Sequence, residues 1–206
     1  MTKITKYWKT VMRKASMTAT FAAVLIVFGA YAQNIGTFTD SRDGKTYKTV
    51  KIGTVVWMAE NLNFAAEGSK CYEDNDANCA KYGRLYNWKT ANIACPAGWR
   101  LPSDDGWTVL VDYVGGEETA GAKLKSASGW NKNGNGTNDF GFSALPGGYG
   151  SSHGNFGNAG NVGYWWTDTE YDPYDAWYRI MDYRNNAVSR IRIFKTSLYS
   201  VRCVED

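Results

Sequence analysis

The 206-residue sequence is poor in the residues that most often carry out catalysis or bind metal ions. It contains a single histidine, His153, in a polar stretch with the composition of a solvated loop. It has four cysteines, and no two of them have the C-x₂₋₄-C spacing typical of zinc sites. No motif places a nucleophile beside a base. These absences argue against a zinc protein and favour a binding module over an enzyme.

Acidic residues are missing from positions 1–33, which hold five basic residues. Removing those five charges takes the formal net charge from +3 to −2, so the rest of the chain lacks the basic excess that nucleic-acid binding requires. An apolar run at 21–28 follows the basic stretch, and Ala30 and Ala32 supply the small residues of a cleavage site. Residues 1–32 are therefore predicted to be a signal peptide.

Long hydrophobic runs are also absent. The apolar segment from Ala19 to Ala32 has 14 residues and would span about 21 Å as a helix, against the ~30 Å of a bilayer core. We therefore expect no permanent membrane span, and no lipid anchor because no cysteine lies at the cleavage point. The mature part, residues 33–206, is expected to be a single domain that is secreted, periplasmic or on the outer cell surface.

Export permits disulfides, and the mature part contains Cys71, Cys79, Cys95 and Cys203. Four cysteines allow three pairings. Cys71 and Cys79 flank a short polar loop that can fold back on itself, which leaves Cys95 for Cys203. The sequence thus predicts disulfides Cys71–Cys79 and Cys95–Cys203.

Strand patterns outnumber helix patterns. Two short helices are predicted, one at 88–93 and one that begins after Ser103, whose hydroxyl can cap the first turn. A Gly/Asn-rich stretch, 129–163, separates the two predicted helices from the C-terminal strands. Strand-like runs lie at 46–52, 55–58, 176–181, 187–194 and 198–204. This order predicts an α+β fold with a mostly antiparallel sheet, two short helices and long loops.

A series of motifs extends over nearly all of the mature part, from about Asp40 to Glu205, and resembles the Fibrobacter succinogenes major paralogous domain. The motifs include Val56-Trp57-Met58-Ala59-Glu60-Asn61-Leu62, Cys95-Pro96-Ala97-Gly98-Trp99-Arg100-Leu101-Pro102-Ser103, Phe142-Ser143-Ala144-Leu145-Pro146-Gly147-Gly148, Tyr164-Trp165-Trp166 and Ser200-Val201-Arg202-Cys203-Val204. The chain departs from the family at Gly106, where a glutamate is expected.

The resemblance implies a surface or secreted bacterial protein without an established activity. It also implies a fold similar to C-type lectins and to the formylglycine-generating enzyme. The redox chemistry of that enzyme is not expected here, because all four cysteines are predicted to be oxidised. The Glu-Pro-Asn sugar motif of lectins is absent from the sequence.

The Gly/Asn-rich segment contains the candidate site. Asn131, Asn138 and Asp139 carry oxygens of the kind that Ca²⁺ binds, although asparagine and glycine are also what turns with positive φ require, which is the favoured explanation of the segment. Four aromatic residues flank the segment and are candidate stacking platforms for sugar rings, with core packing as the alternative: Trp130, Tyr149, Trp165 and Trp166. Since adjacent residues of a strand point to opposite faces, one of the last two is expected in the core and the other accessible.

The sequence therefore favours a non-catalytic extracellular module for a glycan or surface protein, with calcium as the one candidate cofactor. The alternative is an extracellular enzyme, such as a glycan-acting hydrolase. Asp168 and Glu170 near Trp166 are its candidate carboxylate pair. The simpler explanation is that these are charges that keep an edge strand soluble, because nothing in the sequence fixes the separation of the two carboxylates.

Overall fold

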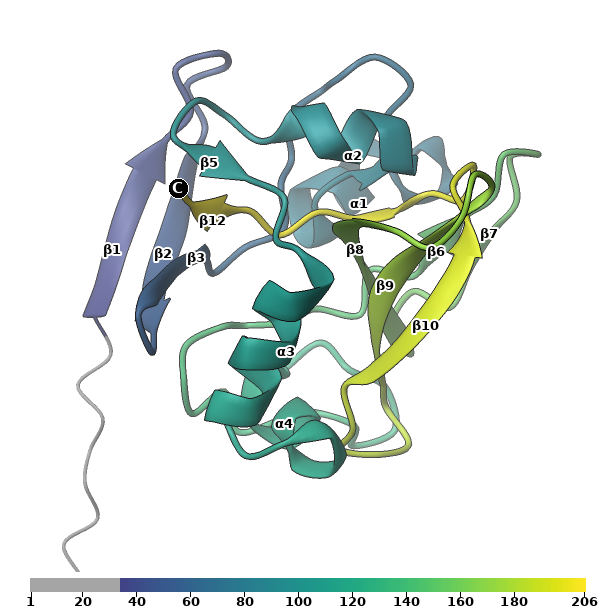
Figure 1. Ribbon diagram of the computed structural model, residues 1–206. Helices are drawn as coiled ribbons and strands as arrows, with labels where there is room; N and C mark the ends of the chain where they lie inside the picture. Colours follow the sequence, from purple (N-terminus) through teal and green to yellow (C-terminus); the bar gives the residue numbers. More distant parts are fainter. Residues whose placement is uncertain (1–33) are drawn as a thin grey trace, which may run out of the picture. The chain divides into compact units, whose positions relative to one another are not determined.

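The computed structural model describes residues 34–206, so the predicted signal peptide, residues 1–32, lies outside the described residues. Residues 34–206 contain two five-stranded sheets, one two-stranded sheet and four α-helices (Figure 1). All strand pairs within the sheets are antiparallel except β11 with β8. The predicted α+β class with mostly antiparallel sheets is confirmed.

The first sheet joins the two ends of the domain. Its strand order is β1-β2-β3-β12-β5. The predicted hairpin forms β2 and β3, and the last strand, β12, lies between β3 and β5. The bounds are β1 Asn34–Thr39, β2 Thr46–Ile52, β3 Val55–Met58, β5 Trp99–Arg100 and β12 Val204–Glu205.

The second sheet has the order β10-β9-β8-β11-β4 and ends on one side at the edge strand β10. A separate two-stranded hairpin consists of β6 (Tyr149–Gly150) and β7 (Phe156–Gly157). The bounds of the second sheet are β4 Leu85–Tyr86, β8 Val162–Glu170, β9 Asp175–Asp182, β10 Ser189–Phe194 and β11 Tyr199–Ser200.

The two predicted helices are present as α2 (Trp88–Ala94) and α3 (Asp104–Tyr113). Ser103 caps α3 as expected, since its Oγ accepts a hydrogen bond from the Gly106 amide at 3.0 Å. No helix within the described range 34–206 is long and apolar enough to cross a membrane.

The prediction of only two helices is wrong, because α1 (Asp76–Tyr82) and α4 (Glu117–Leu124) are also helical, and a 3₁₀ turn, η1 (Tyr72–Asp74), precedes α1. Both missed helices are short and polar, so they show little apolar periodicity. In α4, Gly121 allows a close approach: a Cβ there would lie 2.7 Å from the carbonyl oxygens of Asn186 and Ala187.

Both disulfides have the predicted pairing, Cys71–Cys79 and Cys95–Cys203. The second closes a loop of 108 residues and lies where the chain passes from β11 in one sheet to β12 in the other. In the loop-closure description, such a bridge removes about 4.7 kcal/mol of entropy from the unfolded chain. The end strands are therefore held together covalently as well as by backbone hydrogen bonds.

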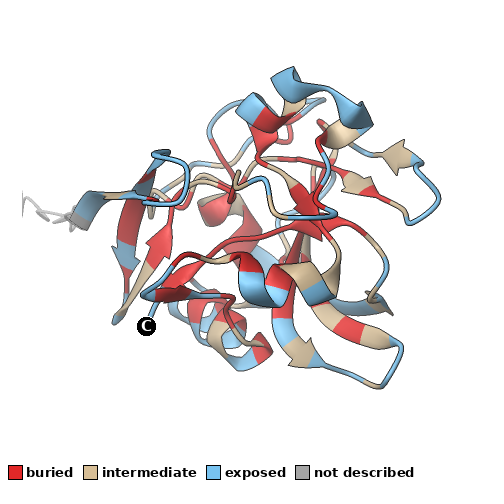
Figure 2. Cartoon of the chain, turned by 90° about the horizontal axis from the view of Figure 1, so that it is seen from above, coloured by how far each residue is buried: buried red, intermediate tan, exposed pale blue. Residues whose placement is uncertain are grey.

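Two hydrophobic cores fill the domain, and Figure 2 shows the buried residues concentrated at its centre. One core contains Trp107 of α3 and Trp165 of β8, together with the inner side of the first sheet. The other contains Trp166 of β8 and lies against α2. The second sheet is thus covered on both faces.

A buried cation lies at the crossing between the sheets. The Arg202 side chain is fully buried, and its Nε and Nη2 donate to Asn61 Oδ1 at 3.2 and 2.8 Å. Its Nη1 donates to the carbonyls of Met58 and Phe142. Asn61 also accepts from Trp165 Nε1 at 2.8 Å. Burial lowers the pKa of the Arg202 guanidinium to about 9, so it remains a cation at neutral pH.

Replacing Asn61 with alanine removes the shared acceptor of Arg202 and Trp165 and leaves a buried charge incompletely bonded. We expect Asn61→Ala to lower the free energy of unfolding by about 3–5 kcal/mol. The measurement is urea denaturation followed by tryptophan fluorescence. Asn63→Ala is the matched control, because only the backbone of Asn63 makes hydrogen bonds. Equal stability of the two variants would contradict the central role of Asn61.

Candidate ligand-binding surfaces

Trp165 and Trp166 are both fully buried, so the expectation that one of them is accessible is wrong. Their side chains do point to opposite faces of β8, as strand geometry requires, but each face is covered by a core. Both indole N–H groups are bonded internally, that of Trp166 to the Tyr86 carbonyl at 2.7 Å. Neither ring is available to stack on a ligand.

Trp130 is also in the core, with 4 % of its surface exposed, and its Nε1 donates to the Ala144 carbonyl at 2.9 Å. Tyr149 is half-buried and packs edge-on against Tyr164 at 5.7 Å between ring centroids. The predicted stacking role of Trp130 is therefore wrong. These aromatics fill the space beneath the Gly/Asn-rich loops, whose glycines contribute no side chains.

Asn138 adopts the left-handed backbone conformation that is common in turns, with a φ of 54°. Its Oδ1 accepts from the Ser143 amide at 2.7 Å and closes the loop between them. Asn131 donates to Asn161 Oδ1, and Asp139 is exposed on the same segment. Among residues 34–206, no group of three or more His, Cys, Asp or Glu side chains is arranged to hold a metal ion. Calcium binding at these three residues stays a prediction.

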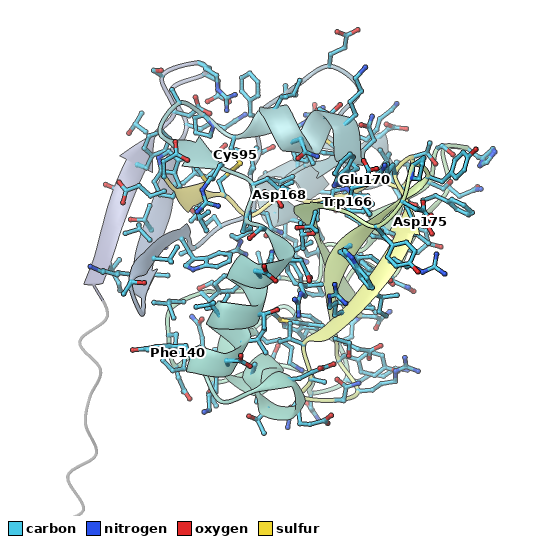
Figure 3. All side chains as sticks on the ribbon, viewed as in Figure 1. Cys95, Phe140, Trp166, Asp168, Glu170 and Asp175 are labelled. Carbon is cyan, nitrogen blue, oxygen red and sulfur yellow. A yellow bond between two sulfur atoms is a disulfide. The ribbon has the colours of Figure 1, made fainter. Side chains whose placement is uncertain are left out.

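Asp168 and Glu170 lie at one end of the second sheet, near Asp175 (Figure 3). The register of β8 against β9 shifts between Trp166 and Glu170. Glu170 Oε2 forms an ion pair with Lys195 Nζ at 2.9 Å, and Asp168 accepts from Thr169 Oγ1. Each carboxylate therefore has a partner of its own, and neither contacts the other.

Another group of aromatic side chains lies on β9, β10 and the turn between β8 and β9: Trp177 is half-buried, and Tyr171 and Phe194 are exposed. Arg190 stacks over Trp177 with 3.4 Å between its Cζ and the ring centroid, and Arg192 stacks over Tyr171 at 4.3 Å. Tyr171 meets Trp177 edge-on at 5.1 Å. We call these four residues the arginine–aromatic ladder. Phe194, which is 64 % exposed, follows Arg192 at a spacing of two and so lies on the same face of β10.

Two carboxylates hold the arginines of the ladder in place. Asp104, at the first position of α3, binds Arg190 Nε at 2.6 Å and the buried Arg179 at 2.7 Å. Asp175 binds Arg192 Nη1 at 2.7 Å. The side chains of Arg190 and Arg192 nevertheless remain 41 % and 48 % exposed. The ladder therefore presents guanidinium groups of fixed orientation at the surface.

The second candidate is a cleft of about 660 Å³ between the β6–β7 loop, the start of α2 and the turn after β10. Its lining includes Lys70, Lys89, Lys195 and His153, with one aspartate, Asp74. We call it the basic cleft. It includes part of the predicted Gly/Asn-rich segment, residues 151–154 and Phe156, but none of the predicted stacking tryptophans.

The family model for the Fibrobacter succinogenes major domain matches residues 50–205. The chain belongs to this family. Comparison with curated proteins and with solved structures finds no significant match. The family assignment confirms the resemblance inferred from the ordered motifs.

The ladder and the cleft were both missed at the sequence level, for different reasons. The ladder had a local signal, because Arg190 and Arg192 alternate with Ile191 and Ile193 and so share one face of a strand. The lysines of the basic cleft come from three separate segments. No local pattern relates them.

The burial of the tryptophans leads to a direct test. Trp130→Ala removes a packed core side chain and is expected to lower the free energy of unfolding by about 3–5 kcal/mol. Tyr174→Ala, at a position that is 76 % exposed, is the control and should change it by less than about 0.5 kcal/mol. Chemical denaturation of the two variants beside the parent protein measures both values. If the Trp130→Ala variant is as stable as the control, the assignment of Trp130 to the core is wrong.

Proposed function

We propose that this domain is an exported, non-catalytic binding module and that the arginine–aromatic ladder recognises an extracellular glycan. The observation that carries the proposal is the stacking of Arg190 on Trp177 and of Arg192 on Tyr171. A stacked guanidinium loses little further freedom on binding, since its orientation is already set. Its remaining N–H groups are free to donate to sugar hydroxyl or carboxylate oxygens.

The apolar part of the surface supports the same proposal. Tyr171 and Phe194 are 47 % and 64 % exposed and lie close to the stacked arginines, so the surface combines apolar rings with hydrogen-bond donors. Aromatic rings contact the apolar C–H patches of sugars, and arginine and aromatic residues are enriched among the anchors of binding surfaces. A relationship to C-type lectins is also part of this proposal. It is supported by the meeting of β1–β3 with β12 in one sheet and by the long excursion between them.

The contacts of His153 support a non-catalytic role. The described residues that bond to His153 are Ser151 and Ser152, and Ser152 Oγ lies 3.4 Å from His153 Nδ1. A general base is normally oriented by a further group, most often a carboxylate. The Glu170–Lys195 ion pair similarly fits a structural role better than that of a carboxylate pair in a hydrolase.

The ladder can be tested by pull-down of the purified protein on insoluble cellulose, xylan and peptidoglycan. Retention on at least one of them is expected. Arg192→Gln and Tyr171→Ala should each weaken that binding by about 2 kcal/mol, because each removes an exposed anchor without opening the core. The affinity is measured by depletion from solution.

Two matched controls carry the same substitutions elsewhere. Arg100→Gln changes an exposed arginine of the first sheet, and Tyr113→Ala changes an exposed tyrosine of α3. Both should bind as the parent protein does. Absence of retention on all three polymers, or equal losses in controls and ladder variants, would refute the proposed surface.

A further inference from the structure

The basic cleft has an unbalanced charge. Three lysines line it against one aspartate, although the mature part of the chain has a formal net charge of −2. Lys70 is paired with Asp74 at 3.1 Å. Within residues 34–206, Lys89 forms no ion pair with any carboxylate. Because Lys70 pairs with Asp74 and Lys195 pairs with Glu170, Lys89 is the lysine that leaves a net positive charge in the cleft, although residues 34–206 are slightly acidic overall.

Lys195 is held in position before any ligand arrives. Its Nζ pairs with Glu170 at 2.9 Å, donates to the Asp172 carbonyl at 2.7 Å and lies 4.7 Å from the Trp88 ring centroid. An ammonium group has three donors, so one N–H of Lys195 remains after these two contacts. The side chain is only 18 % exposed, which limits its motion. A fixed donor costs less entropy to use than a freely moving one.

The loop that closes the cleft is ordered by its own hydrogen bonds. Ser151 Oγ accepts from the amides of His153 and Asn155 at 3.3 and 3.2 Å. The Ser151 amide donates to the Asn155 carbonyl at 2.8 Å. These bonds order the loop that places His153 in the cleft lining, where the residue is exposed and its Nδ1 lies 3.4 Å from Ser152 Oγ.

The lining also has an apolar part. Phe156 of β7 and Leu198, before β11, both line the cleft, and Phe156 packs on Tyr72 at 5.4 Å between ring centroids. An apolar wall with a few converging polar groups is the usual composition of a small-molecule site, and a volume of about 660 Å³ lies in the usual range. This combination suits a small ring that has an apolar face and bears a negative charge.

We infer that the basic cleft is a second binding site, separate from the ladder, for an anionic group on a small ring, such as the carboxylate of an acidic sugar or a sugar phosphate. Lys89 and the free N–H of Lys195 bind the anion, and Phe156 and Leu198 contact the ring. The site does not depend on the ladder. None of the four ladder residues lines the cleft.

Calorimetric titration of the purified protein tests this site. The probes are D-galacturonate, inorganic phosphate and neutral D-galactose. Binding of galacturonate or phosphate, but not of galactose, is expected, and the two anions distinguish a carboxylate from a phosphate as the natural group. The affinity should fall as sodium chloride is raised, because the lysines are partly exposed.

Lys89→Gln should weaken anion binding about fivefold, the loss of one partly exposed ion pair. Lys51→Gln is the matched control, since Lys51 is exposed on β2 and does not line the cleft. The Arg192→Gln variant should bind the anion as tightly as the parent protein does. The anion-binding proposal can therefore be refuted independently of the proposed glycan binding by the ladder. The inference is overturned if neither anion binds, if galactose binds equally well, or if Lys89→Gln and Lys51→Gln behave alike.

Discussion

A single buried cation determines much of this architecture. Arg202 lies between the two sheets, where water cannot solvate it, and a charge in that position is tolerated only if protein groups replace the water. Asn61, two backbone carbonyls and the face of the Phe142 ring, 4.4 Å from its Cζ, provide that replacement. These groups come from distant parts of the chain. Solvating the guanidinium therefore requires the loop after β3, the Gly/Asn-rich segment and the C-terminal strands to meet at one point.

The same crossing explains why the tryptophans of β8 are buried. Asn61 binds Trp165 on one face of the second sheet, and Tyr86 binds Trp166 on the other. The Cys95–Cys203 disulfide attaches the end of α2 to the residue next to Arg202. The second sheet is exposed at its β10 edge, whose residues are exposed or half-buried. Both candidate surfaces lie at that edge, around β10 and the residues that follow it.

Function is accordingly expected at the periphery of a rigid centre. The ladder is fixed by Asp104 and Asp175, and Lys195 by Glu170 and Trp88. In both places the ion pairs fix the orientation of the cations, and N–H groups of the cations remain for further hydrogen bonds. A binding surface built in this way loses little conformational entropy on binding, and loops on a rigid scaffold can vary without disturbing the core.

The sequence alone determined the features that depend on near neighbours. The hairpin of 46–52 with 55–58 follows from alternation, the start of α3 from the Ser103 cap, and the disulfide pairing from the short loop between Cys71 and Cys79. Helices α1 and α4 were not predicted, because their short polar sequences show little apolar periodicity. The tertiary structure alone decided the candidate site. Whether a side chain on a strand is buried depends on what covers that face of the sheet. The lysines of the cleft come from segments as far apart as Lys70 and Lys195, which more than 100 residues separate in the chain. No local pattern encodes either fact, because both are set by packing between segments distant in the chain.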